Sequence, residues 1–185
     1  KHPTKAIKIY QEAAADGYQL GAFYYGCYLM SINQNKEAKV QFKKASSIPA
    51  ADVRLGMIYE TERQYQAAFN KYYHWSLTTD TVPSNKSLIL ATYRLGLCYE
   101  RKIGTERNEK EAYNCYKAIY KQYKPAQIRY ALILEKGCKG ITAQPNSAFE
   151  LYKELSPNTT NLKDDSKISL NEAEALFHVA RCYAH

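Results

Sequence analysis

The stretch ATYRLGLCYE at residues 91–100 decides the fold, because its pattern returns along the 185-residue chain. Its alanine, Leu-Gly pair and tyrosine lie at offsets 0, 4, 5 and 8, which is the spacing of a stripe along one helix. A close copy occupies residues 51–60, and looser copies begin at Gly21, Ala126 and Ala175. The starting positions 21, 51, 91, 126 and 175 are 30 to 49 residues apart. Self-similarity at such intervals predicts a protein built of stacked repeats.

A second recurring element lies between these copies and places an aromatic residue four positions after an alanine. The pairs are Ala6/Tyr10, Ala38/Phe42, Ala68/Tyr72, Ala112/Tyr116 and Ala148/Tyr152. Four positions span one helical turn, so each pair lies on one face of a helix. We name the helices with the Leu-Gly pattern A helices and the others B helices.

The two patterns predict five helices of each kind. A helices are expected at about 19–30, 51–61, 88–101, 125–136 and 172–184. B helices are expected at about 4–15, 36–46, 64–76, 109–121 and 146–155, with long linkers at 77–87 and 156–171. A glycine inside a helix costs roughly 1 kcal/mol relative to alanine. Its recurrence in the A helices therefore indicates that a neighbouring helix backbone approaches closely there.

Composition narrows the class of protein. Apolar residues make up 45% of the chain, as in globular proteins, and no segment has the length and apolarity of a membrane span or a signal peptide. The net charge of +8 favours acidic partners. The 26 basic residues form no run longer than two, which argues against a nucleic-acid-binding tail. Because the fifth copy of the A pattern reaches the last residue, we expect one solenoid domain over residues 1–185, within a longer protein.

The chain shows no arrangement typical of catalysis or of metal binding. It has five cysteines, an odd number, at spacings that suit neither a zinc site nor regular disulfides. They are Cys27, Cys98, Cys115, Cys138 and Cys182, and we expect free thiols in a reducing compartment. No Ser/His/Asp set, HExxH motif or phosphate-binding glycine loop is present. We therefore predict a non-enzymatic protein without cofactor, metal or small-molecule substrate. Glycosylation sequons begin at Asn85 and Asn158.

Residues 91–117 resemble the Sel-one-like repeat. The resemblance lies in the Leu-Gly stretch, in the loop IGTERN at residues 103–108, and in Glu111-Ala112 and Tyr116-Lys117. It implies an all-α, right-handed α/α superhelical solenoid of helix pairs related to tetratricopeptide repeats, acting as a protein-binding scaffold or adaptor. The chain departs from the family pattern where Lys102 replaces the first loop glycine and where residues 137–145 form an insertion.

A narrower resemblance connects the chain with the fungal chitin synthase activators. It rests on residues 93–108, on the extended loop 136–145 and on the segment 175–180 after a long gap. It implies a cytoplasmic protein, peripheral at a membrane, that recruits a membrane chitin synthase. The alternatives are an adaptor in endoplasmic-reticulum-associated degradation or in bacterial virulence or envelope processes. Nucleic-acid binding and cell-wall hydrolysis rank below both.

In the family the A helices line the inner, concave surface, so two stripes of A-helix residues are candidate contacts for a protein or peptide partner. The candidates are Tyr24, Arg54, Arg94, Arg129 and His178 at offset 3, with Tyr28, Ile58 and Ile133 at offset 7. Successive arginines would hold an acidic peptide through forked hydrogen bonds. In the alternative, to which we give more weight, the arginines pair across neighbouring layers with Glu60, Glu100 and Glu135. Trp75 is either an exposed interface anchor or part of the core.

Overall fold

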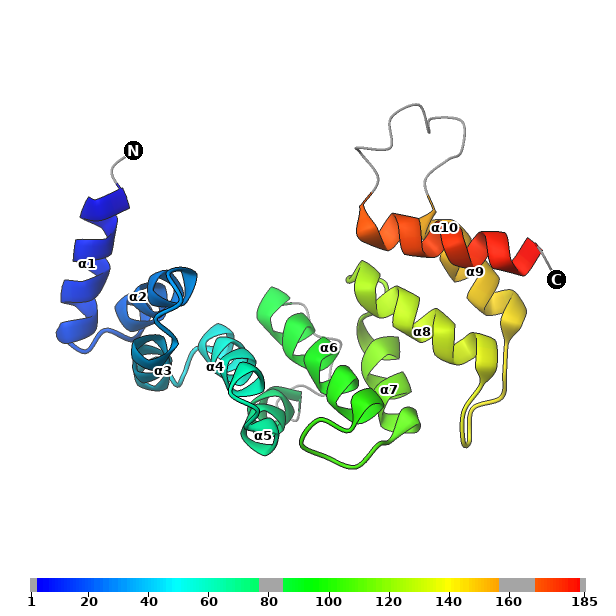
Figure 1. Ribbon diagram of the computed structural model, residues 1–185, viewed down its shortest axis with the longest axis horizontal. Coiled ribbons are helices and arrows are strands. Elements are labelled where there is room, and N and C mark those ends of the chain that lie inside the picture. Colours follow the sequence, from blue (N-terminus) through cyan, green and yellow to red (C-terminus); the bar gives the residue numbers. More distant parts are fainter. Residues whose placement is uncertain (1–2, 77–84, 157–168, 184–185) are drawn as a thin grey trace. The chain divides into compact units, whose positions relative to one another are not determined.

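The computed structural model describes residues 3–76, 85–156 and 169–183, which form ten helices and no strand (Figure 1). The A helices are α2 (Gln19–Ser31), α4 (Pro49–Thr61), α6 (Lys86–Arg101), α8 (Lys124–Lys136) and α10 (Leu170–Tyr183). The B helices are α1 (Pro3–Ala15), α3 (Asn35–Lys44), α5 (Tyr65–Ser76), α7 (Glu109–Ile119) and α9 (Pro145–Leu155). Both sets confirm the ten predicted helices. The linkers expected at 77–87 and 156–171 lie mostly outside the described residues.

Local sequence explains where the helices begin and end. The Asn108 side chain accepts a hydrogen bond from the backbone N–H of Glu111 and so caps α7. At the other end of the A helices, Asn33, Arg63 and Lys102 each have a φ near 60°. This left-handed conformation is the usual end of a helix before a tight turn. Lys102 therefore adopts the backbone conformation that a loop glycine would supply.

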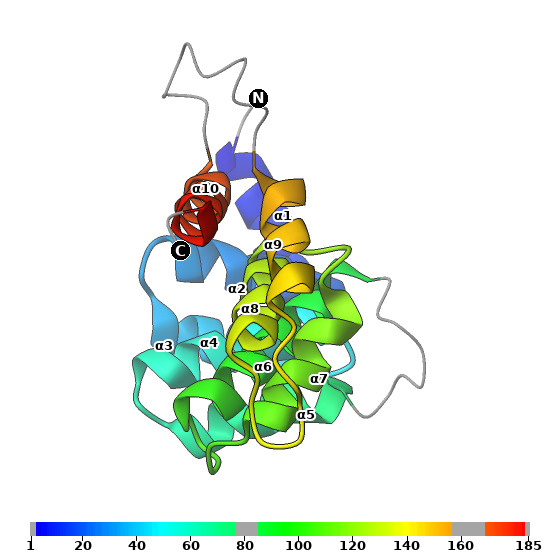
Figure 2. The same ribbon diagram turned by 90° about the vertical axis from the view of Figure 1, so that its right-hand side faces the viewer.

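The chain forms two compact units. Unit 1 comprises Lys1–Arg94 with Ile103–Thr105, and unit 2 comprises Leu95–Lys102 with Glu106–His185. In unit 1, neighbouring helices from α1 to α5 pack in chain order around a core that includes Leu29, Phe42 and Leu55. In unit 2, α8 packs between α7 and α9, and α10 packs on α9 and α8 (Figure 1 and Figure 2).

In α2, α4 and α6 the recurring glycine receives the aromatic ring of the following B helix, whereas α8 and α10 carry alanine at this position. A Cβ atom on Gly96 would lie 2.5 Å from Cε1 of Tyr116, and one on Gly56 would lie 2.6 Å from Cε1 of Tyr72. Close approach at these glycines is confirmed, but it is made by a side chain rather than by the helix backbone that we expected. In these three A helices the ring covers the backbone at the glycine and so packs the A helix against the B helix that follows it.

Candidate functional site

Three glutamates near the ends of A helices each join two side chains from other helices. Each carboxylate accepts a hydrogen bond from the tyrosine of the following B helix and pairs with an arginine of the next A helix. The sets are Tyr72–Glu60–Arg94, Tyr116–Glu100–Arg129 and Tyr152–Glu135–Arg181. We call each set a rung.

The rung centred on Glu100 shows how these groups are held. The Tyr116 hydroxyl donates to Oε2 at 2.6 Å, and Nη1 of Arg129 lies 3.1 Å from Oε1. Tyr116 is fully buried, whereas the Arg129 and Glu100 side chains are each 27% exposed. Hydrogen bonds to charged groups contribute about 1.5–3 kcal/mol each, so the rung fastens helices of successive layers. The predicted pairing of Arg94 and Arg129 with glutamates of the preceding layer is confirmed.

The last rung differs from the sequence expectation, because its arginine is Arg181. At offset 3 of α10 stands His178, which is 7% exposed and stacks on the Tyr152 ring with centroids 4.7 Å apart. Burial lowers the pKa of His178 below its usual value, and the nearby positive charge of Arg181 lowers it further. Burial also raises the pKa of Tyr152, and the Glu135 charge adds to this shift, so the Tyr152 hydroxyl stays protonated and donates. The arginine of this rung stands three positions later in the A-helix pattern than Arg94 and Arg129 do, at offset 6 instead of offset 3.

The candidate stripe residues fall into three environments. Ile58 is 1% exposed and belongs to the core of unit 1, so it offers no surface to a partner. Tyr24 and Arg54 are exposed, and Tyr28 is half-buried. Arg129 and Ile133, both half-buried, are the two candidates that the structure brings together at a hollow in unit 2.

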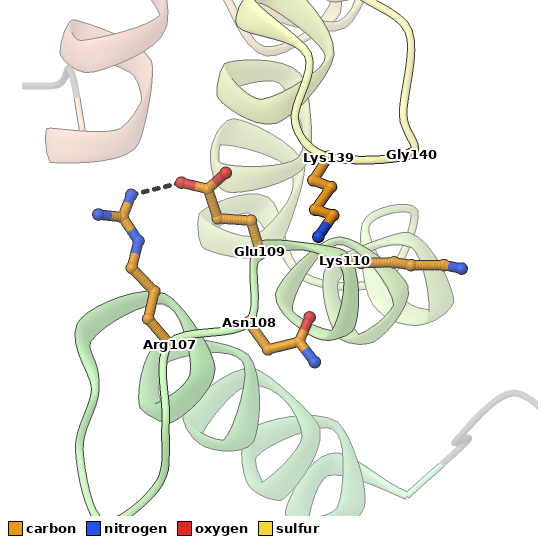
Figure 3. Close-up of a pocket in the computed structure, with 6 residues that line it drawn as sticks. All are labelled: Arg107, Asn108, Glu109, Lys110, Lys139 and Gly140. Carbon is orange, nitrogen blue, oxygen red and sulfur yellow. Dashed lines mark hydrogen bonds and ion pairs between the residues drawn. The ribbon is translucent and has the colours of Figure 1, made fainter.

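This hollow, which we call the basic hollow, consists of two adjoining cavities of about 500 and 250 Å³. Arg107 and Glu109 border both cavities. The larger cavity is completed by Asn108, Lys110, Lys139 and Gly140 (Figure 3). The smaller one is completed by Glu100, Ala112, Arg129, Leu132, Ile133, Lys136, Gly137 and Cys138.

Backbone hydrogen bonds fix both walls of the basic hollow. On one side, the N–H of Asn108 donates to the carbonyl of Tyr99 at 3.0 Å. On the other, Cys138 and Ile141 exchange two backbone hydrogen bonds of 3.0 and 2.8 Å, which close a tight turn around Lys139 and Gly140. Gly140 has a φ of 84°, a conformation that favours glycine. The insertion noted in the sequence therefore builds an ordered wall that carries Lys139.

The charges of the basic hollow leave an excess of cations. Arg107 pairs with Glu109, and Arg129 is held in its rung. Lys110, Lys136 and Lys139 are exposed, and none of them forms an ion pair within the described part of the chain. Figure 3 shows the Lys139 side chain directed from its turn toward the N-terminal end of α7. The hollow therefore combines three available ammonium groups with a partly apolar lining, which suits an acidic ligand that also carries apolar groups.

Trp75 binds a buried carboxylate in unit 1. Its indole nitrogen donates to Oδ2 of Asp52 at 3.1 Å, while Nζ of Lys71 lies 2.8 Å from Oδ1. Asp52 is only 4% exposed, so these two donors satisfy a buried carboxylate. Trp75 itself is half-buried. Of the two interpretations of Trp75, the structure supports the one in which it is part of the core.

None of the five cysteines, all within the described residues, forms a disulfide. Cys98 is buried beside Cys115, and burial together with the Glu111 charge raises the pKa of the Cys115 thiol to about 12. A protonated thiol is a weak nucleophile.

Across residues 3–76, 85–156 and 169–183, no three His, Cys, Asp or Glu side chains are grouped to hold a metal ion. The same residues contain no helix with the length and apolarity that a membrane crossing requires. Asn85 is exposed, and Asn158 lies outside the described residues.

The order and pairing of the helices match two solved structures. One is a protective antigen present in uropathogenic Escherichia coli strains, described as displaying an SLR fold. It superposes on 98% of this chain with a TM-score of 0.71 at 19% sequence identity. The other is a Sel1 repeat protein from Oxalobacter formigenes, which covers 97% of this chain with a TM-score of 0.69 at 22% identity. The chain has the Sel1-like repeat fold.

This Sel1-like fold confirms the predicted all-α solenoid class. The chain spans 41% of the Escherichia coli protein and 72% of the Oxalobacter protein. No family model and no curated protein matches the sequence. What the chain shares with these two proteins is therefore the fold, and the function must be argued from its own residues.

Proposed function

We propose that this chain is a non-catalytic, protein-binding scaffold whose basic hollow holds an acidic segment of a partner protein. The observation that carries the proposal is that Lys110, Lys136 and Lys139, which form no ion pair in the described chain, border the two adjoining cavities of the hollow. Repeat proteins of paired helices usually act by binding other proteins. The Sel1-like fold supports the same conclusion.

The lining of the hollow favours a peptide over a nucleic acid. Leu132 and Ile133 are half-buried and give part of the lining an apolar character. Two of the five basic residues are already engaged, Arg107 by Glu109 and Arg129 in its rung. Nucleic acids require a longer basic track that follows successive phosphates. A peptide that places two or three carboxylates beside one apolar side chain fits both the charge and the lining.

A fluorescence anisotropy titration with a labelled ten-residue peptide of Asp, Glu and Leu tests this proposal. We expect the double variant Lys110→Glu/Lys139→Glu to bind about tenfold more weakly than the unchanged protein, because two attractive contacts become repulsive. The matched control is Lys43→Glu/Lys44→Glu, which makes the same charge change at exposed positions of α3 in unit 1. The control should stay within about twofold. Equal losses in both variants, or tighter and steeply salt-dependent binding of a single-stranded oligonucleotide, would contradict the proposal.

The specific form of this proposal is recruitment of a membrane chitin synthase. Its support is the resemblance of residues 93–108 and 136–145 to fungal chitin synthase activators, since the second segment builds one wall of the hollow. The unchanged protein should retain a chitin synthase from detergent-solubilised fungal membranes, and Lys110→Glu/Lys139→Glu should not. If the peptide binds but no synthase is retained, the specific form fails and the scaffold remains.

An adaptor of a bacterial envelope or virulence complex is the second candidate, because both structural neighbours are bacterial proteins. The same two variants distinguish it. Retention of a bacterial envelope protein by the unchanged chain, and its loss with the charge-reversed hollow, would favour this candidate over the fungal one.

A further inference from the structure

The first layer of unit 1, formed by α2, α3 and α4, has an arginine at the rung position but no glutamate to pair with it. In the A helices the rung glutamates stand at offset 9, as in Glu60 and Glu100, and the arginine of the next layer stands at offset 3, as in Arg94. Offset 9 of α2 is Met30, and offset 3 of α4 is Arg54. The arginine position is therefore retained in this layer, but the glutamate position is apolar.

The tyrosine of the rung is replaced as well. The B helix that follows α2 carries Phe42, whose ring lies over Gly26 with Cε1 2.8 Å from where a Cβ would be. This is the same contact that Tyr72 makes with Gly56 in the next layer. Phe42 has no hydroxyl and so needs no acceptor, which agrees with methionine at the acid position.

Arg54 remains accessible beside this apolar rung. It is exposed, whereas the side chain of the rung arginine Arg94 is 27% exposed. No ion pair engages Arg54 within residues 3–76, 85–156 and 169–183. Met30 packs against the core that α2 and α4 share. Burial raises the pKa of Cys27 and the Arg54 charge opposes that shift, which places the guanidinium near this face of α2.

The surroundings of Arg54 suit a peptide. Tyr24 is 43% exposed and stacks on Tyr10 with ring centroids 5.1 Å apart, and Tyr28 is half-buried, so α2 carries one tyrosine in each of the two stripes. Tyrosine supplies contact area and a polar end at low conformational cost, and arginine binds carboxylates through two parallel hydrogen bonds. These residue types on α2 and α4 suit an acidic side chain with adjacent apolar groups.

We propose that a carboxylate of the partner peptide takes the place of the missing glutamate on Arg54 and so completes the first rung. The inference rests on the proposed function, because it assumes that the partner is an acidic protein segment. It concerns unit 1 alone and uses none of the residues of the basic hollow.

A substitution that introduces the missing glutamate into α2 tests this inference. The variant Met30→Glu/Phe42→Tyr transplants a whole rung into the first layer, so its internal carboxylate competes with the peptide for Arg54. The Arg54 side-chain Nε–H resonance, followed by NMR while the Asp/Glu/Leu peptide is titrated, reports on this site directly. We expect the transplant variant to need about tenfold more peptide than the unchanged protein to reach the same change in the Arg54 resonance. The control Met30→Gln/Phe42→Tyr keeps the size without the charge and should respond like the unchanged protein.

The outcomes separate this inference from the proposed function. If Lys110→Glu/Lys139→Glu weakens peptide binding but the Arg54 resonance never responds, the inference is overturned and the scaffold stands. If Arg54 responds and keeps its response in Lys110→Glu/Lys139→Glu, the inference is supported independently. An equal response to inorganic phosphate at the same concentration would overturn the preference for a peptide carboxylate. Should the transplant fail to fold by circular dichroism, Arg54→Gln at the exposed position replaces it, and unchanged overall peptide affinity in that variant would contradict the inference.

Discussion

The first layer and the later layers solve the same packing problem with different chemistry. Around Glu60, Glu100 and Glu135 a buried tyrosine hydroxyl, a carboxylate and an arginine meet in a rung. Around Met30 and Phe42 the equivalent space is apolar. Phe42 covers Gly26 just as Tyr72 and Tyr116 cover Gly56 and Gly96, so the charges are not needed for that contact. The rungs add a link to the next A helix. In the first layer, where the glutamate is absent, Arg54 is exposed and forms no ion pair within the described residues.

The largest effect is expected from removing the acid of a rung. Glu100→Ala leaves the buried Tyr116 hydroxyl and the Arg129 guanidinium without their common acceptor, and we expect a loss of about 3 kcal/mol in the free energy of unfolding. Urea denaturation followed by circular dichroism measures this loss. The matched variant in the first layer, Met30→Ala, should cost about half as much, because it leaves no polar group unsatisfied. Equal losses would show that the two layers do not differ in the way described.

A smaller effect is expected from removing only the hydroxyl of a rung. Tyr116→Phe keeps the ring over Gly96 and deletes one hydrogen bond to Glu100, so a loss of about 1 kcal/mol is expected. Phe42→Tyr in the first layer should bring no gain, because methionine offers its hydroxyl no acceptor of comparable strength. Thermal unfolding of both variants checks the contrast, and a gain from Phe42→Tyr would contradict it.

The smallest effect is expected from protonating His178. Its pKa is lower in the folded chain than the usual value of 6.5, chiefly because it is buried. The unfolded chain therefore binds the proton more readily, so the stability contributed by neutral His178 is present above pH 6.5 and is lost as pH falls below it. Amide exchange in α10 should become faster below that pH, while exchange in α2 should not. His178→Phe retains a ring beside Tyr152 and should remove the pH dependence; a dependence that survives would assign it to another group.

Periodicity predicted the ten helices and their pairing in stacked repeats, because small residues at one offset and aromatic rings at another mark the packed faces, and the resemblance to the Sel-one-like repeat supplied the solenoid class. It also predicted that the arginines at offset 3 would pair with Glu60, Glu100 and Glu135 across neighbouring layers; the structure shows this for Arg94 and Arg129, each with the glutamate of the preceding layer, but not for Arg54. It did not predict Arg181, whose offset differs from that of the other rung arginines. It treated Ile58 as a surface residue, although α4 turns that position into the core.

The basic hollow could not be derived from the repeat pattern. One of its walls, the end of the loop before α7, belongs to the repeat pattern, but the other, the turn around Lys139, comes from the insertion at residues 137–145, which the repeat does not specify. The position of Lys139 depends on the positive-φ residues Gly137 and Gly140 and on the backbone hydrogen bonds between Cys138 and Ile141, which periodicity does not predict. The charge of +8 indicated an acidic partner, but only the folded chain shows that three lysines border these two cavities.

A rung draws its carboxylate from one repeat and its arginine from the next. The chain can therefore be shortened or lengthened cleanly only by whole periods. An excision from residue 61 to residue 100 would join Glu60 to the segment that supplies Arg129 and restore a complete set of partners. An excision displaced by half a period would leave either a glutamate or an arginine without its partner. The rung positions therefore define where repeats can be removed or added.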